Sequence, residues 1–274
     1  MHTLYQQMAG DSLAETLTRL ESDIKSRPAD ADLRAAFVQL LCLAGNWQRA
    51  RTQLKSWAAL KPQAQPTVTL LEQAIEGELT RAQVFAGETA PRMPQEAWPW
   101  VHHLVAALAR ESAGDSAAAL ALREQALEAA ELNPGTLQVN EDSVAFDWLM
   151  DGDARLGPVC EFIVNGHYFW APFCAIREII FQAPASVTDL VWRHARITLV
   201  DGSEQVCQIP ARYPVDARTE DRFLLGRETH WAALDEDGAF CLGQGQKVLL
   251  NADDAYSLLT LETLAFAGSE SDHE

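Results

Sequence analysis

The chain has 274 residues, 48% of them hydrophobic, and a formal net charge of −18. This length and apolar content allow one large core or two medium ones, which argues against wholesale disorder. No apolar run approaches the roughly 18 residues of a membrane helix, and the first residues lack the basic and apolar segments of a signal peptide. We therefore expect a cytoplasmic protein that does not enter a membrane.

The negative charge is concentrated in the second half of the chain. Residues 1–140 carry a net charge of −4, and residues 141–274 carry −14. Such a surface repels phosphate backbones, so nucleic-acid binding is not expected. A basic or neutral protein partner is compatible with this charge, although solubility alone is the simpler explanation.

The five cysteines are odd in number and far apart, and no two have the spacing of zinc ligands. Each stands among apolar neighbours, which is typical of small buried side chains in a reducing compartment. We expect neither a metal site nor a disulfide from them. They are Cys42, Cys160, Cys174, Cys207 and Cys241.

The first half of the chain is predicted to be helical. Apolar residues recur at helical spacing over 33–44, and Gly45 can end that helix in the left-handed conformation. Asn46 can cap a second helix, whose apolar face covers 47–57 and which Pro62 stops. These residues predict a pair of antiparallel helices.

Three more apolar stripes at helical spacing follow, and a segment with several prolines separates two of them. The stripes cover residues 71–82, 101–108 and 119–130. Residues 85–99 contain three prolines and are predicted to form a loop.

Two of the helical hairpins are related by a regular offset. Gly45 in the first is followed 69 residues later by Gly114 in the second, and this offset is close to two tetratricopeptide units of about 34 residues. A small residue, Ala50 or Ala119, stands five residues after each glycine, where two helices would approach closely. We expect a degenerate helical repeat with a concave surface, an architecture that favours protein binding over catalysis.

Beyond residues 133–135 the pattern changes to short strands and turns, so the predicted fold class is α+β. The predicted hairpin 196–209 turns at Asp201-Gly202, because Asp-Gly supplies the positive φ angles of a tight turn. One helix is expected at 156–164, ended by Asn165-Gly166. The other expected strands are 177–182, 240–242 paired with 247–250 around a turn at 243–245, and 260–266.

These patterns predict an N-terminal all-helical, TPR-like domain and a β-rich C-terminal domain with antiparallel strands. The predicted boundaries are 1–134 for the helical domain, 135–268 for the β-rich domain and 269–274 for an acidic tail.

Three carboxylates offer the best candidate for chemistry. Asp147, Asp151 and Asp153 lie close together in sequence, and hard cations prefer several carboxylate oxygens. Helix starts and turns also favour aspartate, so capping and turn roles are the preferred interpretation. No nucleophile elbow, phosphate loop or chelating histidine pair is present, and we expect neither an enzyme nor a bound cofactor.

Several long strings resemble a known family. They are residues 40–50, residues 153–159 with 163–173, residues 189–192 and residues 209–214. Together they resemble the ImpE family, also called TagJ or SciE, an accessory component of bacterial type VI secretion. The resemblance extends from about Gly10 to Phe266.

The resemblance implies a non-enzymatic protein that binds the N-terminal helix of the small contractile-sheath subunit. It also implies a role in sheath assembly or in disassembly by a ClpV-type unfoldase, which the protein would meet indirectly. A helical-repeat groove could receive such an amphipathic helix. A metal-dependent enzyme using the three aspartates, and a purely structural subunit, stay open as alternatives.

Eight aromatic or apolar residues and one arginine make up the candidate partner-binding set. The preferred position is an N-terminal groove around Phe37, Leu41 and Trp57. The full set is Phe37, Leu41, Trp57, Trp98, Trp100, Tyr168, Trp170, Arg212 and Tyr213.

Overall fold

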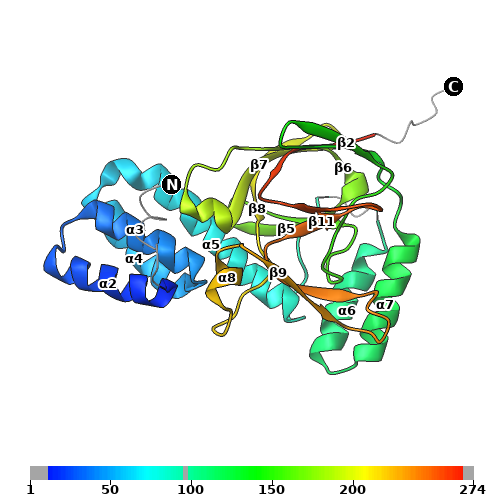
Figure 1. The fold of residues 1–274 in the computed structure, drawn as a ribbon, viewed down its shortest axis with the longest axis horizontal. Helices are drawn as coiled ribbons and strands as arrows, with labels where there is room; N and C mark the ends of the chain where they lie inside the picture. Colours follow the sequence, from blue (N-terminus) through cyan, green and yellow to red (C-terminus); the bar gives the residue numbers. More distant parts are fainter. Residues whose placement is uncertain (1–11, 95–97, 268–274) are drawn as a thin grey trace.

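A computed structural model describes residues 12–94 and 98–267 (Figure 1). Helices occupy the chain up to residue 129, and antiparallel strands dominate the remainder, so the α+β class is confirmed. None of the helices in these ranges is both long enough and apolar enough to cross a membrane. The expected acidic tail, 269–274, lies outside the described residues.

Within the described residues, the helical half contains the predicted helices and one more. The additional helix α2 begins at Ser12, whose hydroxyl accepts a hydrogen bond from the Glu15 backbone N–H while the Glu15 carboxylate bonds back to Ser12. The helices described in this half are α2 (Leu13–Ser26), α3 (Ala31–Leu43), α4 (Trp47–Leu60), α5 (Gln65–Phe85), α6 (Val101–Ser112) and α7 (Ser116–Ala129).

The pairs α3–α4 and α6–α7 form the two predicted hairpins. Gly45 and Gly114 adopt φ angles of 66° and 81° at the turns, which is the left-handed conformation that glycine tolerates. Ala50 and Ala119 are fully buried, as the close approach of paired helices requires. Asn46 stands at the predicted N-cap position of α4, but the expected hydrogen bond from its side chain is not made.

Most of the strands form one eight-stranded antiparallel sheet in the order β2-β1-β13-β6-β7-β8-β4-β5. Two small sheets, β10-β9 and β12-β11-β3, lie beside it. The strands of the main sheet are β1 (Gly135–Val139), β2 (Asp142–Phe146), β4 (Val159–Val164), β5 (His167–Pro172), β6 (Ile176–Phe181), β7 (Trp192–Leu199), β8 (Glu204–Pro210) and β13 (Leu261–Phe266). The strands of the small sheets are β3 (Met150–Asp151), β9 (Thr229–Ala233), β10 (Cys241–Gly245), β11 (Val248–Leu250) and β12 (Ala255–Ser257). Short helical segments complete the fold: η1 (Pro62–Ala64), η2 (Phe173–Ala175), η3 (Val187–Leu190) and α8 (Asp221–Leu224).

Some strand predictions are confirmed and two assignments are wrong. The hairpin β7–β8 and the strands β6 and β13 lie where they were expected. The helix expected at 156–164 is instead strand β4, and Asn165 and Gly166 have φ angles of 50° and 82° in the tight turn to β5. Residues 243–245 do not form a turn but continue β10, which pairs with β9.

Helix α5 joins the helical half to the sheet. Figure 1 shows α2–α4 at one end, α6 and α7 at the other, and α5 between them against the sheet. One core cluster combines side chains of the N-terminal helices with those of β4, β5 and β7, while a second fills the other side of the sheet. At Gly77 of α5, an added Cβ would lie 2.6 Å from Ile163 of β4, so the absence of a side chain permits this close approach.

The first core cluster crosses residue 134, so the helices and the sheet do not have separate interiors. We keep the division at residue 134 as a proposal based on the change of secondary structure.

Candidate functional site

Two features meet at Asp151: a buried ionic cluster and an open apolar groove. The ionic cluster consists of Glu78, Arg81, Asp151, Glu161 and Lys247, all at most 6% exposed. Arg81 binds Glu161 with both its Nε and Nη2 atoms, each at 2.7 Å from a carboxylate oxygen. Lys247 Nζ lies 2.5 Å from Asp151 Oδ2 and 2.7 Å from Glu161 Oε1.

Aromatic side chains complete the hydrogen bonding of the ionic cluster. Tyr168 donates its hydroxyl to Glu161 at 2.6 Å, and Tyr213 donates to Asp151 at 3.0 Å. Trp192 Nε1 donates to Glu78 at 3.1 Å. Buried charges are tolerated when they are paired and hydrogen-bonded in this way.

Opposite charges in the cluster favour the ionised forms of Glu161 and Lys247, whereas burial outweighs Lys247 at Asp151 and raises the pKa of that carboxyl. Burial alone would raise the pKa of Glu161, but the adjacent Arg81 and Lys247 outweigh it and hold that pKa at about 2. Burial would likewise lower the pKa of Lys247, yet the carboxylates of Asp151 and Glu161 raise it above its ordinary value. The cavity beside Glu161 and Lys247 measures only about 10 Å³, so the cluster has no room for a substrate.

The aspartates considered as metal ligands are separated or paired instead. Asp147 is exposed, Asp151 is bound by Lys247, and Asp153 forms a bidentate pair with Arg155. The helix they were expected to cap is strand β4, although Asp151 and Asp153 do accept turn hydrogen bonds from backbone N–H groups two residues later. Across the ranges 12–94 and 98–267, no group of three His, Cys, Asp or Glu side chains could hold a metal ion.

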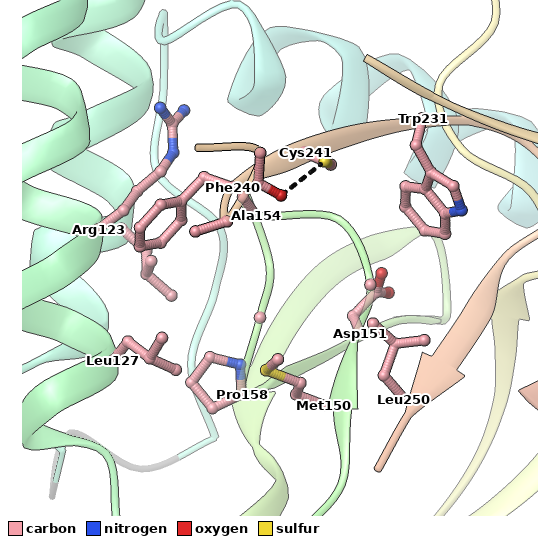
Figure 2. A pocket seen from close by; sticks show the side chains of 15 residues that line it. Arg123, Leu127, Met150, Asp151, Ala154, Pro158, Trp231, Phe240, Cys241 and Leu250 are labelled. Atoms are coloured by element: carbon pink, nitrogen blue, oxygen red, sulfur yellow. Dashed lines mark hydrogen bonds between the residues drawn. The ribbon is translucent and has the colours of Figure 1, made fainter. Parts of the chain in front are cut away.

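The second feature, which we call the α7 groove, opens between helix α7 and the strands β3, β10 and β11. Figure 2 shows Leu127 of α7 on one side of the hollow and Trp231 and Leu250 on the other, with Met150 and Pro158 between them. This inner compartment has a volume of about 320 Å³. Its walls are mostly apolar or aromatic, as is usual in binding sites.

An outer compartment of about 250 Å³ continues the groove along α7. Leu127, Met150 and Pro158 line both compartments, so the two adjoin. Leu132 and Trp148 line only the outer compartment. Leu127 is 43% exposed and Leu132 is 73% exposed, which places two large apolar side chains in contact with solvent along one groove.

Local structure explains why these side chains face the groove. Arg123 and Leu127 are four residues apart on α7 and therefore share one face of the helix. Gly152 allows Trp231 to lie against the β3 end of the groove, because a Cβ at that position would lie 2.5 Å from the indole ring. Tyr213 supports the same indole, with ring centroids 5.6 Å apart.

Acidic residues border the α7 groove. Glu131 lines the outer compartment, and the exposed Glu124 and Glu128 stand one position from the lining residues Arg123 and Leu127. On the opposite side, residues 235–237 (Asp-Glu-Asp) directly precede Gly238, which lines the inner compartment. Arg123 is the cation among the lining residues, and Glu111 pairs with it.

The structure places almost the whole candidate partner-binding set inside the molecule. Eight of the nine side chains are at most 7% exposed, and Trp98 is partly exposed. Their contact with a partner stays a prediction. The eight buried residues are Phe37, Leu41, Trp57, Trp100, Tyr168, Trp170, Arg212 and Tyr213.

Several of these residues have defined internal partners. Arg212 donates to the backbone carbonyls of Cys42, Leu43 and Leu224 at 2.9, 2.6 and 2.6 Å. Trp100 Nε1 donates to Glu131 at 2.9 Å. Phe37, Leu41 and Trp57 belong to the first core cluster, and an open groove lies beside α7.

Sequence reasoning did not identify the residues of the ionic cluster on α5 or the groove. Glu78 and Arg81 interrupt the apolar stripe of α5, and two charges on an otherwise apolar helix face are a signal that could have been used. The groove joins α7 to strands more than 20 residues later, and its β-side residues, Trp231 and Phe240, carry no local pattern that indicates a site.

Comparisons with known proteins show which family the chain belongs to. The sequence model of the family described as ImpE protein matches residues 143–265. The chain is 38% identical over 255 residues to a Pseudomonas aeruginosa protein named type VI secretion system accessory component TagJ, covering 93% of this chain and 87% of that protein. The crystal structure of protein VPA1032 from Vibrio parahaemolyticus has a TM-score of 0.86 and 26% identity, covering 97% of this chain and 98% of that one. At this identity and coverage, the chain belongs to the ImpE family that includes TagJ.

Proposed function

We propose that this chain is a non-enzymatic accessory protein of type VI secretion that binds the N-terminal helix of the small contractile-sheath subunit in the cytoplasm. By holding that helix it would modulate sheath assembly, or sheath disassembly by a ClpV-type unfoldase. The name of the Pseudomonas relative supports the accessory role. The resemblance of the sequence to its family supports the choice of partner.

The observation that carries the proposal is the open apolar groove beside α7. An amphipathic helix binds by laying its apolar face into such a groove, with anchors one helical turn apart. The two adjoining compartments, of about 320 and 250 Å³, offer places for these anchors.

The test is a capture experiment with the purified chain as bait. The intact small sheath subunit should be retained, and the same subunit lacking its first helix should be lost. Equal retention of both forms would refute the proposed partner segment.

The metal-dependent alternative rests on Asp147, Asp151 and Asp153. Salt bridges to Lys247 and Arg155 occupy two of these carboxylates, so we expect no heat on calorimetric titration with magnesium or manganese. A third possibility, a purely structural subunit, predicts sheath lifetimes that do not change when the protein is removed, whereas the proposed function predicts that they do.

A further inference from the structure

We infer that the α7 groove recognises one class of ligand: an amphipathic helix with two large apolar side chains about one turn apart and lysine or arginine beside them. The inference deepens the proposed function and rests on it for the identity of the partner protein. The site and the chemistry of the ligand are argued from the groove alone.

The shape of the groove favours two anchors. The inner and outer compartments measure about 320 and 250 Å³, so each has room for a large apolar side chain. The compartments share Leu127, Met150 and Pro158 as walls and are therefore neighbours. Side chains three or four residues apart on a helix are separated by about 5–6 Å at their Cβ atoms, which suits two adjoining compartments.

The backbone of the groove floor favours a helix over an extended peptide. The N–H groups of Asp151, Gly152 and Ala154 already donate to the carbonyls of Gly157, Val248 and Cys241, at 2.7, 3.0 and 2.8 Å. An added strand would find these donors occupied, and strand addition depends on free main-chain groups. A helix satisfies its own backbone and needs only side-chain contacts.

The border of the groove favours basic flanks on the ligand. Glu131 lines the α7 side, the exposed Glu124 and Glu128 stand one position from lining residues of α7, and residues 235–237 (Asp-Glu-Asp) directly precede the lining residue Gly238 on the other side. The lining cation, Arg123, is compensated by Glu111. A ligand with lysines beside its apolar stripe therefore meets opposite charge on both sides, which speeds association and excludes acidic helices.

The experiment uses two designed peptides with the full chain as receptor. Each peptide has about 18 residues, or five helical turns, with the same apolar stripe. One carries lysine flanks and its twin carries glutamate flanks, and binding is followed by fluorescence anisotropy at low and moderate salt. The lysine peptide should bind at least about tenfold more tightly than its twin, and salt should reduce the difference.

Receptor variants locate the site. Leu127→Asp changes the shared wall and Leu132→Asp changes the outer compartment; both side chains are partly or largely exposed, so the fold should persist. Each should weaken binding of the lysine peptide, with a loss of at least about tenfold for Leu127→Asp. Val206→Asp is the matched control, because Val206 is 72% exposed on β8 and lines neither compartment.

Charge reversal gives a second readout that does not depend on packing. Glu124→Lys together with Glu128→Lys should weaken the lysine peptide and strengthen its glutamate twin. Equal binding of the twins, or unchanged binding by Leu127→Asp with a folded circular-dichroism spectrum, would overturn the inference.

A second titration distinguishes a failure of this inference from a failure of the proposed function. A peptide of the first helix of the small sheath subunit is titrated against the same variants. If it binds the unaltered chain and Leu127→Asp equally well, the sheath partner stands and the assignment of the groove fails. If it does not bind the unaltered chain while the lysine peptide binds in the groove, the partner fails and the groove assignment stands.

Discussion

The ionic cluster and the α7 groove share Asp151 but have opposite physical characters. The cluster is sealed, charged and fully paired, and the cavity beside it measures about 10 Å³. The groove is open, mostly apolar and about 320 Å³ in its inner compartment. A buried charge network can hold α5 on the sheet but offers nothing to a partner, whereas exposed leucines contribute little to folding and can contribute much to binding. Changes in the cluster should therefore act on stability, and changes in the groove on recognition.

The largest loss of stability is expected from Arg81→Leu. This change leaves Glu78 buried without its cation and removes one of the two cations that bind Glu161, which should cost about 3–5 kcal/mol in the free energy of unfolding. Urea denaturation measures the loss. The matched control is Arg51→Leu, which breaks an exposed pair with Glu76 and should cost less than about 1 kcal/mol. Equal losses for the two variants would show that the cluster has no special structural role.

Acid should weaken the same cluster in a defined pH range. Glu161 has a folded-state pKa of about 2 against an ordinary value of 4.5, so its ionised form stabilises the fold above pH 4.5. That contribution, on the order of 3 kcal/mol, is lost as the pH falls from about 4.5 toward 2. Urea denaturation at a series of pH values measures the slope. Glu161→Gln should be less stable at neutral pH and have a flatter acid profile, and an unchanged slope in this variant would contradict the assignment.

A smaller effect is expected where α5 meets β4. Gly77→Ala gains about 1 kcal/mol of helix propensity, but its new methyl group would lie 2.6 Å from Ile163. Overpacking of this kind costs about 1–3 kcal/mol, so a net loss of about 1 kcal/mol is expected on thermal or urea unfolding. In an Ile163→Ala background the same change should become stabilising. If Gly77→Ala stabilises the unaltered chain, the helix and strand are not held at this distance.

The smallest change in stability is expected in the groove. Leu132→Asp alters a side chain that is 73% exposed, and the free energy of unfolding should stay within about 0.5 kcal/mol of the original. Urea denaturation checks this value. A loss comparable to that of Arg81→Leu would mean that the groove is part of the core, and the contrast between the two regions would disappear.

Strong local patterns predicted much of the fold. The apolar stripes predicted α3 to α7, and Asp201-Gly202 predicted the β7–β8 hairpin, because each of these patterns is complete within a short segment. β4 was predicted as a helix because its residues are buried one after another and lack the alternation that marks a half-buried strand. Asn165-Gly166 fits both a helix end and a tight hairpin turn, and only pairing with β5 decides between them.

The candidate site was less predictable because it depends on contacts between distant segments. Asp151 was identified as a possible metal ligand, but Lys247, which neutralises it, is 96 residues away. Aromatic residues such as Trp170 and Tyr213 suggested a binding surface, yet large aromatic side chains serve cores equally well and these two are fully buried. Which apolar residues stay exposed, as Leu127 and Leu132 do, is decided by the packing of α7 on α6, which the local sequence does not specify.

The most direct test is hydrogen–deuterium exchange of the full chain with and without the small sheath subunit. We expect added protection at the backbone of residues 123–132, 150–158 and 238–241, with no change over 31–60, where α3 and α4 carry Phe37, Leu41 and Trp57. Leu127→Asp should abolish that protection. Protection over α3 and α4 with unchanged exchange around the α7 groove would contradict the account.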